Sequence, residues 1–325
     1  MTNLITGCAG FIGFHLSLQL LKKNKKIIGI DNLNNYYDQK LKRDRLKILK
    51  SYKHFFFYKE SIQSKKIKKI FSKYKIDNVI NLAAQAGVRY SISNPDIYLK
   101  SNLIGFCNLI ELSKEFNVKH FIYASTSSVY GENKKNKFSE KDTIEKPLQF
   151  YAATKSANEL IAYSYSNIFK LRTTGLRFFT VYGPWGRPDM ALFKFVKNGL
   201  MNKKVEIYNH GKHLRDFTYV DDIVFYVNKI LQSKLDEEKR IPHDVYNIGG
   251  GSPIKLMSFV KIIEKKLKIT LKKKYLNLQK GDIVRTNANN HKLIKKFKIK
   301  KFTKIERGVS NFISWYKKYY KIKNV

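Results

Sequence analysis

A glycine-rich turn between a short apolar strand and an apolar helix constrains this chain more than any other stretch of its sequence. Leu4-Ile5-Thr6 has the length of one buried strand, the segment from Gly7 to Gly13 follows at once, and His15 to Leu21 has the apolar spacing of a helix. A helix N-terminus offers free N–H groups and the positive end of its dipole, and glycines let the backbone approach a phosphate closely. We therefore expect the pyrophosphate of a dinucleotide to bind at Gly7, Gly10, Phe11, Ile12 and Gly13.

An acidic residue ends the second predicted strand. Lys26 to Ile30 is apolar enough for a buried strand, and Asp31 follows it, 24 residues after Gly7. A carboxylate at this position accepts hydrogen bonds from both hydroxyls of the adenosine ribose and repels a 2′-phosphate. The spacing predicts NAD rather than NADP as the cofactor. The alternative is that Asp31 only caps the loop that follows it.

The large positive charge raises the question of a nucleic-acid partner. The chain has 325 residues and a net charge of +39, but 54 of its 64 basic residues are lysines and only 10 are arginines. The lysines are spread along the whole chain, whereas nucleic-acid sites favour the planar, bidentate arginine. We therefore expect no nucleic-acid partner, with a basic RNA-binding protein built on a Rossmann fold as the alternative from another class.

The sequence shows no features that would predict a membrane span, a secretion signal or a metal site. No apolar run approaches the ~18 residues of a membrane span, and nothing before the first strand resembles a signal peptide. Cys8 and Cys107 do not have the spacing of metal ligands. We expect a cytoplasmic protein with reduced cysteines, no membrane association and no metal site.

Alternating strands and helices predict an α/β fold with a doubly wound parallel Rossmann sheet. Further strands are expected at His54–Tyr58, Val79–Leu82, His120–Ala124 and Thr173–Arg177. Helices are expected at Ile62–Tyr74, from Asn94 to about Phe116, and at Tyr151–Phe169. Ligands gather at the carboxyl ends of such strands, where Ala83 and Ala84 are small enough for a cofactor to lie against them.

After Arg177 the pattern loosens and predicts a smaller α/β substrate-binding lobe. It contains a turn-rich segment at Gly183–Pro188, a helix at about Met190–Met201, an extended piece at Val205–Tyr208, one more core strand at Val245–Ile248 and then two lysine-rich helices. We expect a Rossmann domain of residues 1–177, completed by segments within about 217–250. The substrate-binding lobe, residues 178–325, is then interleaved with it.

The residues that carry chemistry follow the fifth predicted strand. Ser125-Thr126-Ser127-Ser128 ends this strand, and Tyr151 opens the next helix with Lys155 four residues later. This spacing puts both side chains on one helix face, and a phenol of pKa ~10 loses its proton more easily beside a lysine cation. Because the spacing occurs five times in this chain, its position after the hydroxyl cluster is what selects Tyr151 as a general base with Lys155 as its partner.

Taken together, these features resemble the UDP-glucuronate 4-epimerases, a group of extended short-chain dehydrogenase/reductases in the NAD-dependent epimerase/dehydratase family. The resemblance rests on residues 6–13, 30–37, 84–91, 177–190, 210–212 and 215–222, and it covers nearly the whole chain. It implies an isomerase of nucleotide-sugar metabolism that interconverts UDP-glucuronate and UDP-galacturonate. The reaction would pass through a 4-keto intermediate with tightly bound NAD, and the protein would be a homodimer.

The resemblance also implies roles for individual residues. Tyr151, Lys155 and Thr126 would be catalytic, and the neighbouring hydroxyls would hold the carboxylate of the sugar. Cofactor contacts are implied for Asn32, Leu82, Ala83, Ala84, Asn102 and Phe178. Substrate contacts are implied for Arg89, Thr126, Ser127, Ser128, Thr180, Arg187, Arg215 and Asp282, with Arg215 placed for the diphosphate. Two places depart from the family pattern: Lys59-Glu60-Ser61 stands where Gly-Asp is usual, and Val284 replaces a proline.

Other activities and the assembly stay open at this point. A UDP-glucose or UDP-N-acetylglucosamine 4-epimerase and a UDP-glucuronate decarboxylase are the alternatives. Dehydratases of this fold carry Asp-Glu where this chain has Ser127-Ser128, which argues against dehydration. For the dimer, the resemblance implies a four-helix interface made by the helices that begin at Asn94 and Tyr151. Residues with helical spacing for this interface, or for packing on the sheet, are Phe106, Leu109, Ile161 and Tyr165.

Overall fold

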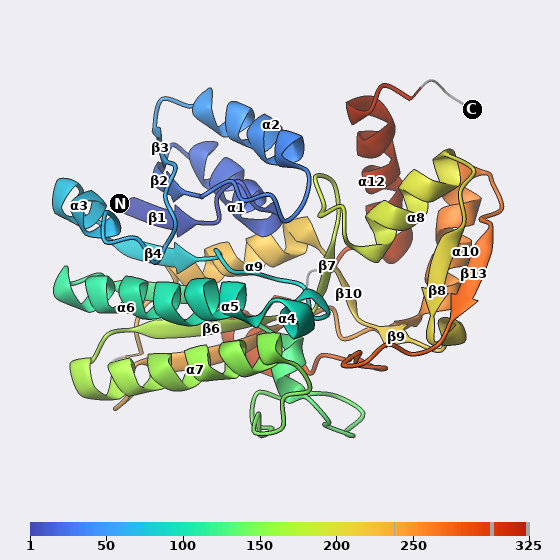
Figure 1. Cartoon of the computed structure of the whole chain (residues 1–325). Coiled ribbons are helices and arrows are strands. Elements are labelled where there is room, and N and C mark those ends of the chain that lie inside the picture. The colour runs from blue at the N-terminus through green and yellow to red at the C-terminus, as the bar shows by residue number, and fades with distance from the viewer. Residues whose placement is uncertain (237, 300–301, 323–325) are drawn as a thin grey trace.

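A seven-stranded parallel sheet forms the centre of the protein in a computed structural model that describes residues 1–236, 238–299 and 302–322 (Figure 1). The strands, in their order across the sheet, are β11 (His243–Ile248), β6 (Thr173–Phe178), β5 (His120–Thr126), β4 (Asn78–Asn81), β1 (Thr2–Thr6), β2 (Lys26–Ile30) and β3 (Phe55–Tyr58). The chain runs from β1 outward to β3 and then returns to β4 on the other side of β1. This reversal is the switch point of a doubly wound fold, so the predicted fold class is confirmed.

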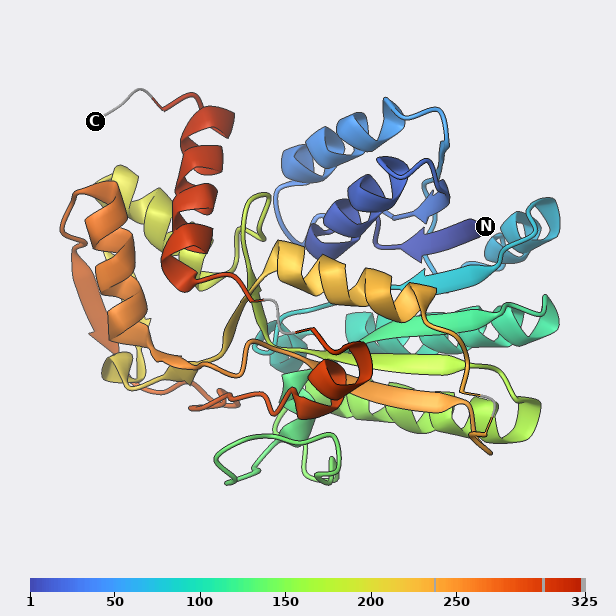
Figure 2. The same cartoon turned by 180° about the vertical axis from the view of Figure 1, so that it is seen from behind.

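Two helical layers cover the two faces of the sheet, because successive strand residues point to opposite sides. Leu4 belongs to the core beneath one layer, and Ile5 belongs to the core beneath the other. Figure 1 shows α6 and α7 in front of the sheet. Figure 2, which views the molecule from the opposite side, shows α9 in front of the other face. The helices of the first layer are α3 (Ile67–Lys73), α5 (Pro95–Tyr98), α6 (Gly105–Glu115) and α7 (Phe150–Phe169), and those of the second are α1 (Phe11–Leu21), α2 (Gln39–Lys50) and α9 (Val220–Gln232).

The smaller lobe lies beyond the carboxyl ends of the strands and has its own apolar core (Figure 1). Its helices are α8 (Ala191–Leu200), α10 (Leu256–Leu267) and α12 (Ile305–Tyr319), and its strands pair as β8 (Val205–Tyr208) with β13 (Lys273–Leu276). Shorter elements link the lobes: β7 (Thr180–Tyr182), β9 (Leu214–Arg215), β10 (Phe217–Tyr219), β12 (Ile254–Lys255) and α11 (His291–Phe297). Because α9 and β11 return to the large sheet, this arrangement supports the proposed division into two interleaved lobes.

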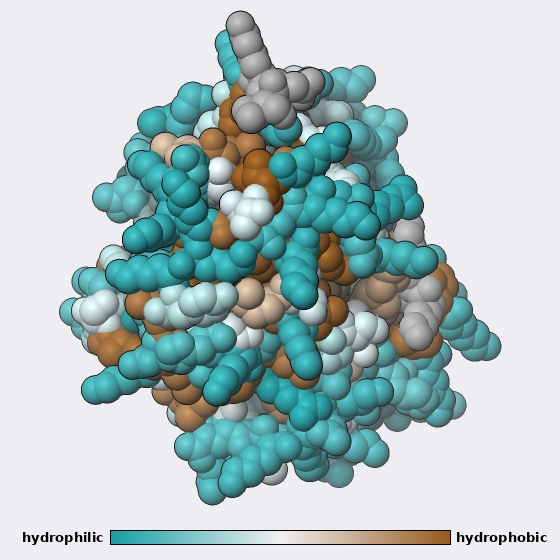
Figure 3. Space-filling view, turned by 90° about the vertical axis from the view of Figure 1, so that its right-hand side faces the viewer, coloured by the Kyte–Doolittle hydropathy of each residue, from teal (hydrophilic) through white to brown (hydrophobic). Residues whose placement is uncertain are grey.

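Hydrophilic side chains cover most of the face of the molecule seen in Figure 3, with apolar atoms visible between them. Among the described residues, the lysines other than Lys42 and Lys155 keep part of their side chains in contact with water, which solvates their charges. Within the described ranges, no helix is long and apolar enough to cross a membrane.

Several elements differ from the sequence predictions, among them α9, which was not predicted between the extended piece at Val205–Tyr208 and the strand at Val245–Ile248. The helix α2 was not predicted, although Asp38 caps it by accepting a hydrogen bond from the Lys40 amide at 2.8 Å. The helix α3 begins five residues later than expected, since Asn108 of α6 donates to the Ile62 carbonyl at 2.7 Å and holds that segment outside the helix. In the part of the chain that the structure describes, three helices rather than the expected two follow β11.

The four residues expected at a dimer interface lie on the inner face of their helices. Phe106 and Leu109 are buried in the core beneath α6, and Ile161 and Tyr165 pack against the same core. Phe106 and Leu109 therefore follow the second alternative, packing on the sheet of their own chain, whereas Ile161 and Tyr165 keep part of their side chains exposed and their place in an interface stays a prediction. The outer surface of the same helices exposes other apolar side chains: Ile97, Ile104, Leu160, Tyr163, Ile168 and Phe169.

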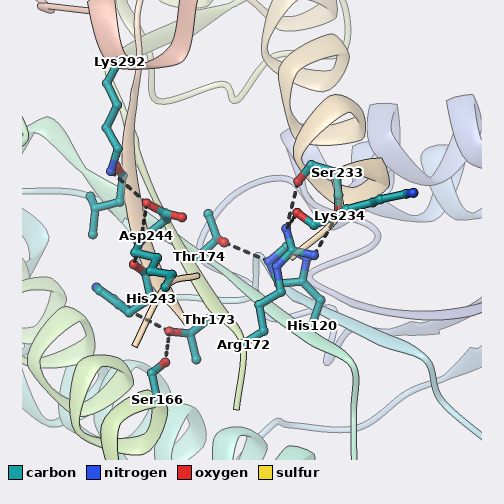
Figure 4. A network of polar contacts seen from close by, with 12 residues as sticks. His120, Ser166, Arg172, Thr173, Thr174, Ser233, Lys234, His243, Asp244 and Lys292 are labelled. Atoms are coloured by element: carbon teal, nitrogen blue, oxygen red, sulfur yellow. Dashed lines mark hydrogen bonds and ion pairs between the residues drawn. The ribbon is translucent and has the colours of Figure 1, made fainter. Parts of the chain in front are cut away.

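A polar network joins the starts of β5, β6 and β11 at the sheet edge opposite the strand ends described below (Figure 4). His243 Nδ1 lies 2.8 Å from Thr173 Oγ1, and His120 Nε2 lies 2.8 Å from Thr174 Oγ1. Arg172 donates to the backbone carbonyl of Ser233 at 2.8 Å. These bonds satisfy polar groups that the strand ends would otherwise bury without partners.

Candidate active site

The glycine turn at the end of β1 is as tight as the sequence predicted. Gly7 has φ +68°, and a Cβ atom there would lie 2.8 Å from the Ala83 amide nitrogen. A Cβ atom on Gly13 would lie 2.1 Å from the Gly7 carbonyl oxygen, so only glycine lets α1 pack this closely on the turn. No side chain caps the first turn of α1 at Gly10. Its N–H groups therefore suit an anionic group of a ligand.

Asp31 stands at the end of β2 and faces the same cavity as the turn. Its Oδ2 accepts a hydrogen bond from the Ala9 amide at 3.1 Å, and its Oδ1 accepts one from the Leu33 amide at 2.8 Å. Burial raises the pKa of this carboxyl, while these amides and the charges of Lys42 and Arg45 oppose the rise. The remaining lone pairs of the carboxylate are free to accept the hydroxyls of a ribose.

Two neighbouring cavities follow the carboxyl ends of the strands. The first, which we call the cofactor cavity, lies over β1 and β2, and the second, which we call the substrate cavity, reaches into the smaller lobe. They share residues at their junction, among them Phe11, Thr126, Tyr151, Phe178 and Arg187. A group bound in one cavity can therefore react with a group bound in the other, beside Tyr151.

The predicted cofactor residues line the cofactor cavity, with one exception. Those that line it are Gly7, Gly10, Phe11, Ile12, Gly13, Asp31, Asn32, Leu82, Ala83, Ala84, Tyr151, Lys155 and Phe178. The side chain of Asn102 instead points into the interior, where it accepts from the Gln85 amide at 2.8 Å and donates to Thr154 Oγ1 at 3.1 Å. Asn102 thus braces the loop after β4 against α7, and it sits in a π-helical segment, Leu99–Ile104 (η1).

Tyr151 and Lys155 lie in the first two turns of α7, next to the end of β5. Lys155 Nζ donates to the Ala124 carbonyl at 2.9 Å, and burial lowers the pKa of this lysine to about 8. Burial also raises the pKa of Tyr151, against which the charge of Arg187 and a hydrogen bond with Thr126 act. The group of three predicted catalytic side chains is therefore assembled at the junction of the two cavities.

Hydroxyl groups line the part of the substrate cavity next to Tyr151. Thr126, Ser127 and Ser128 are buried at the end of β5, and Thr180 faces the same cavity from the start of β7. Thr126 Oγ1 accepts a hydrogen bond from the Ser128 amide at 3.2 Å, which fixes the turn that presents these side chains (η2, Ser127–Tyr130). All four are uncharged and able both to donate and to accept hydrogen bonds.

The three predicted anion-binding arginines line the substrate cavity, and their guanidinium groups differ in the partners that they contact. Arg187 makes a bidentate pair with Asp189 at 2.5 and 3.0 Å. Arg89 is paired with Asp282 at 2.8 Å. Arg215 donates to the Leu214 carbonyl at 3.4 Å, and burial lowers its pKa to about 10. Of the three, Arg215 has the greatest need of a counter-anion from a ligand.

The two departures from the family pattern fall in different surroundings. Glu60 and Ser61 line the cofactor cavity together with Ile62 and Gln63. Val284 lies at the surface with 42% of its side chain exposed. No group of three or more side chains able to hold a metal ion occurs in the described part of the chain.

Two buried cations of α2 were missed by the sequence analysis. Lys42 lines the cofactor cavity and donates to Asn34 Oδ1 at 2.6 Å, and burial lowers its pKa to about 8. Arg45 donates to the Ala9 carbonyl at 2.8 Å and to the Trp185 carbonyl at 2.6 Å. Arg45 thus ties the glycine turn to the loop that carries Arg187. The spacing of Leu41, Leu46 and Leu49 was the signal that could have revealed this helix.

The similarity of this chain to known proteins covers both of its lobes. The family model described as "NAD dependent epimerase/dehydratase family" matches residues 3–249. The chain is 48% identical to Protein CapI of Staphylococcus aureus, over 99% of this chain and 100% of that one. It is 43% identical to UDP-glucuronate 4-epimerase 4 of Arabidopsis thaliana, over 98% of this chain and 76% of that one. A solved structure of UDP-glucuronic acid 4-epimerase from Bacillus cereus, in complex with UDP-glucuronic acid and NAD, superposes with a TM-score of 0.92 at 32% identity, over 98% and 100% of the two chains.

Proposed function

Because the chain belongs to the NAD-dependent epimerase/dehydratase family and is an NAD-dependent nucleotide-sugar epimerase, we propose that it interconverts UDP-glucuronate and UDP-galacturonate. The observation that carries this proposal is the set of uncharged hydroxyls beside Tyr151 in the substrate cavity. The Arabidopsis relative named for this activity and the Bacillus cereus enzyme with UDP-glucuronic acid bound support the same substrate.

The residues of the cofactor cavity fit NAD. The glycines of the turn line the cofactor cavity without side chains, so a pyrophosphate can approach their backbone, and Asp31 offers carboxylate oxygens for the adenosine ribose. The charge of Asp31 disfavours a 2′-phosphate. When bound, NAD supplies the oxidation of the sugar at C4 and its reversal.

Tyr151 is the general base of the proposed reaction. It takes the proton of the sugar 4-hydroxyl and returns it after the sugar has turned over, so that either face of C4 can be reduced. Thr126, which shares a hydrogen bond with Tyr151, holds the reacting oxygen, and the charge of Arg187 favours the phenolate. Lys155 is anchored to the Ala124 carbonyl and directs its remaining N–H groups to the ligands of the junction.

The hydroxyl groups have a specific task with a uronate substrate. Oxidation at C4 makes a β-keto acid, which loses CO₂ when the bond to the carboxylate aligns with the carbonyl π system. Ser127, Ser128 and Thr180 can donate hydrogen bonds to the carboxylate and hold it in a rotamer that does not react. They leave the carboxylate ionised, and none of them is a carboxylic acid or another strong general acid for the enolate that CO₂ loss would form.

The diphosphate of the substrate is assigned to Arg215. Its guanidinium lines the substrate cavity, is largely buried and has no carboxylate within bonding distance in the described residues. A diphosphate supplies the missing counter-charge, and a planar guanidinium binds two phosphate oxygens at once.

A product analysis tests the proposed function. The purified protein is incubated with UDP-glucuronate, and NMR identifies the product; UDP-galacturonate is expected without added cofactor. UDP-glucose and UDP-N-acetylglucosamine are tested in parallel, because epimerases of neutral sugars are the leading alternative. Faster turnover of either neutral sugar, or CO₂ as the main product from UDP-glucuronate, would contradict the proposal.

A further inference from the structure

His213 is a buried histidine of the substrate cavity to which neither the family pattern nor the reaction gives a role. It precedes β9 and lines the cavity with Arg215, Asp282 and Tyr208. Only 5% of the residue is exposed, and its Nε2 has no hydrogen-bond partner in the described part of the chain. A buried polar atom without a partner costs free energy, so its position on a ligand cavity points to a ligand group.

The surroundings of His213 determine which kind of hydrogen bond this nitrogen can make. The Tyr208 carbonyl accepts a hydrogen bond from the ring, and since Nε2 is unpartnered, the donor is Nδ1. Burial and the charges of Arg215 and Arg89 lower the pKa of His213, against the smaller opposing effect of Asp282. A neutral imidazole protonated at Nδ1 carries a lone pair on Nε2. His213 therefore offers a hydrogen-bond acceptor to the cavity.

A second acceptor lies directly beside the first. Asp282 Oδ2 is 3.9 Å from His213 Nε2, and the carboxylate is also paired with the partly exposed side chain of Arg89. The lone pair of His213 and the negative charge of Asp282 repel each other unless donors of a ligand form hydrogen bonds with them. A ligand group with two neighbouring hydrogen-bond donors satisfies both acceptors at once.

Among the parts of a UDP-sugar, the ribose meets this requirement. A diphosphate has no donors at neutral pH, and the pairing edge of uracil has a single N–H between two carbonyl oxygens. The 2′- and 3′-hydroxyls of ribose are two donors on neighbouring carbons. We propose that His213 and Asp282 together bind the ribose of the substrate nucleotide, with His213 Nε2 accepting the hydrogen bond of one hydroxyl and Asp282 that of the other.

The position of Arg215 agrees with this assignment. Residues two apart on an extended segment project to the same side, so His213 and Arg215 face the cavity next to each other. A diphosphate on Arg215 would place the adjoining ribose at His213. The inference rests on the proposed function, because it requires a nucleoside diphosphate in this cavity.

Binding of UDP and its deoxy analogues to the NAD-loaded protein tests the role of His213. Calorimetry at pH 7.5 measures the affinities of UDP, 2′-deoxy-UDP and 3′-deoxy-UDP for the wild-type protein, His213→Leu and His213→Gln. His213→Leu should bind UDP about two- to twelve-fold more weakly, as expected for one neutral hydrogen bond. It should also bind one of the two deoxy analogues with wild-type affinity, because that analogue lacks the hydroxyl that His213 contacts. His213→Gln, which keeps an acceptor oxygen, should recover most of the lost affinity.

The controls separate this inference from the proposed function. His210→Asn changes a neighbouring exposed histidine that does not line the cavity and should bind all three nucleotides like the wild type. Wild-type UDP affinity in His213→Leu, or an equal loss for UDP and both deoxy analogues, would overturn the role of His213 alone. Failure of the wild-type protein to bind UDP would overturn the proposed function and, with it, this inference.

Discussion

The Nζ atom of Lys155 donates a hydrogen bond to the Ala124 carbonyl at 2.9 Å and thereby ties the start of α7 to the end of β5. The helix carries Tyr151 and the strand carries Thr126, so this bond brings together the two groups that we propose to act on the same substrate oxygen. Glu159, on the next turn of α7, accepts from Ser125 at 2.5 Å and pairs with Arg177 at 2.7 Å, which fixes the same junction from below. The proposed catalytic geometry is therefore held by the protein's own groups.

The first prediction concerns the general base. Tyr151→Phe should keep the fold and the bound NAD but lose about three powers of ten in kcat, because one acid–base group supplies roughly 10²–10⁴-fold. Turnover is measured with UDP-glucuronate, and the nucleotide content is measured after denaturation. Tyr52→Phe, at a tyrosine packed far from both cavities, is the matched control. Near-wild-type turnover of Tyr151→Phe would mean that another group takes the proton.

The second prediction concerns cofactor choice. Asp31→Asn should lower the amount of NAD that remains bound through gel filtration at least about tenfold, because the substitution removes a charge-assisted acceptor of the ribose hydroxyls and places an NH₂ group opposite either the Ala9 or the Leu33 amide. The wild-type protein should release NAD and no NADP when denatured. Asp38→Asn removes a carboxylate outside the cavity, and asparagine still caps α2, so it should retain NAD. Equal NAD content in all three proteins would contradict the assigned role of Asp31.

The third prediction concerns stability at acid pH. Burial lowers the pKa of His243 from 6.5 to about 4, so between these values the unfolded chain binds a proton that the folded protein excludes. The free energy of unfolding should therefore fall as the pH decreases from about 6.5 to about 4, by up to ~3 kcal/mol for this residue. His243→Asn keeps a donor for Thr173 Oγ1 and should flatten the curve measured by urea unfolding at several pH values.

A histidine at the surface provides the comparison for this experiment. His291→Asn, at the exposed start of α11, should leave the pH dependence as in the wild type. If His243→Asn and the wild type lose stability in parallel between pH 6.5 and 4, the acid sensitivity comes from other groups, of which the buried His15 and His120 are the next to test.

Sequence alone predicted those parts of the site that depend on neighbouring residues along the chain. The glycine turn, Asp31 and Tyr151 each follow or precede a strand or helix in a fixed order, and this order decides where they lie. Lys42 and Arg45 could not be selected in the same way, since charged residues are everywhere in this lysine-rich chain and only their burial distinguishes them.

Residues whose role depends on contacts between distant segments were harder to assign. Asn102 was expected at the cofactor, but its side chain bonds to Gln85 and Thr154, from two other parts of the chain. Phe106 and Leu109 have the spacing of either a core face or an interface, and only the position of α6 on the sheet decides between these alternatives. His213 gained a candidate role only when the structure placed its ring beside Asp282.

The fourth prediction concerns assembly through the outer surface of α7. Leu160 and Ile168 are 66% and 63% exposed there, and Ile104 of the neighbouring helix is 50% exposed. Exposed apolar side chains gathered on these helices are costly in water, so we expect a homodimer that buries them. Light scattering should give twice the chain mass at micromolar concentration, and Leu160→Glu should give a monomer. Met201→Lys, at another exposed apolar residue, should leave the dimer intact. A monomeric wild-type protein would contradict the prediction.

The last prediction separates epimerisation from decarboxylation. Two or three hydrogen bonds to the ionised carboxylate, at roughly 1.5–3 kcal/mol each, are enough to favour one rotamer strongly. Ser127→Ala or Thr180→Ala removes one of them, so epimerisation should slow by about tenfold or more and the fraction of 4-keto pentose product should rise together with NADH. NMR of the products and absorbance of NADH measure the partitioning. Ser310→Ala, at an exposed serine of α12, should partition like the wild type. Unchanged partitioning in both cavity variants would show that these hydroxyls do not restrain the carboxylate, whereas CO₂ release as the main reaction of the wild-type enzyme would assign the chain to the decarboxylases.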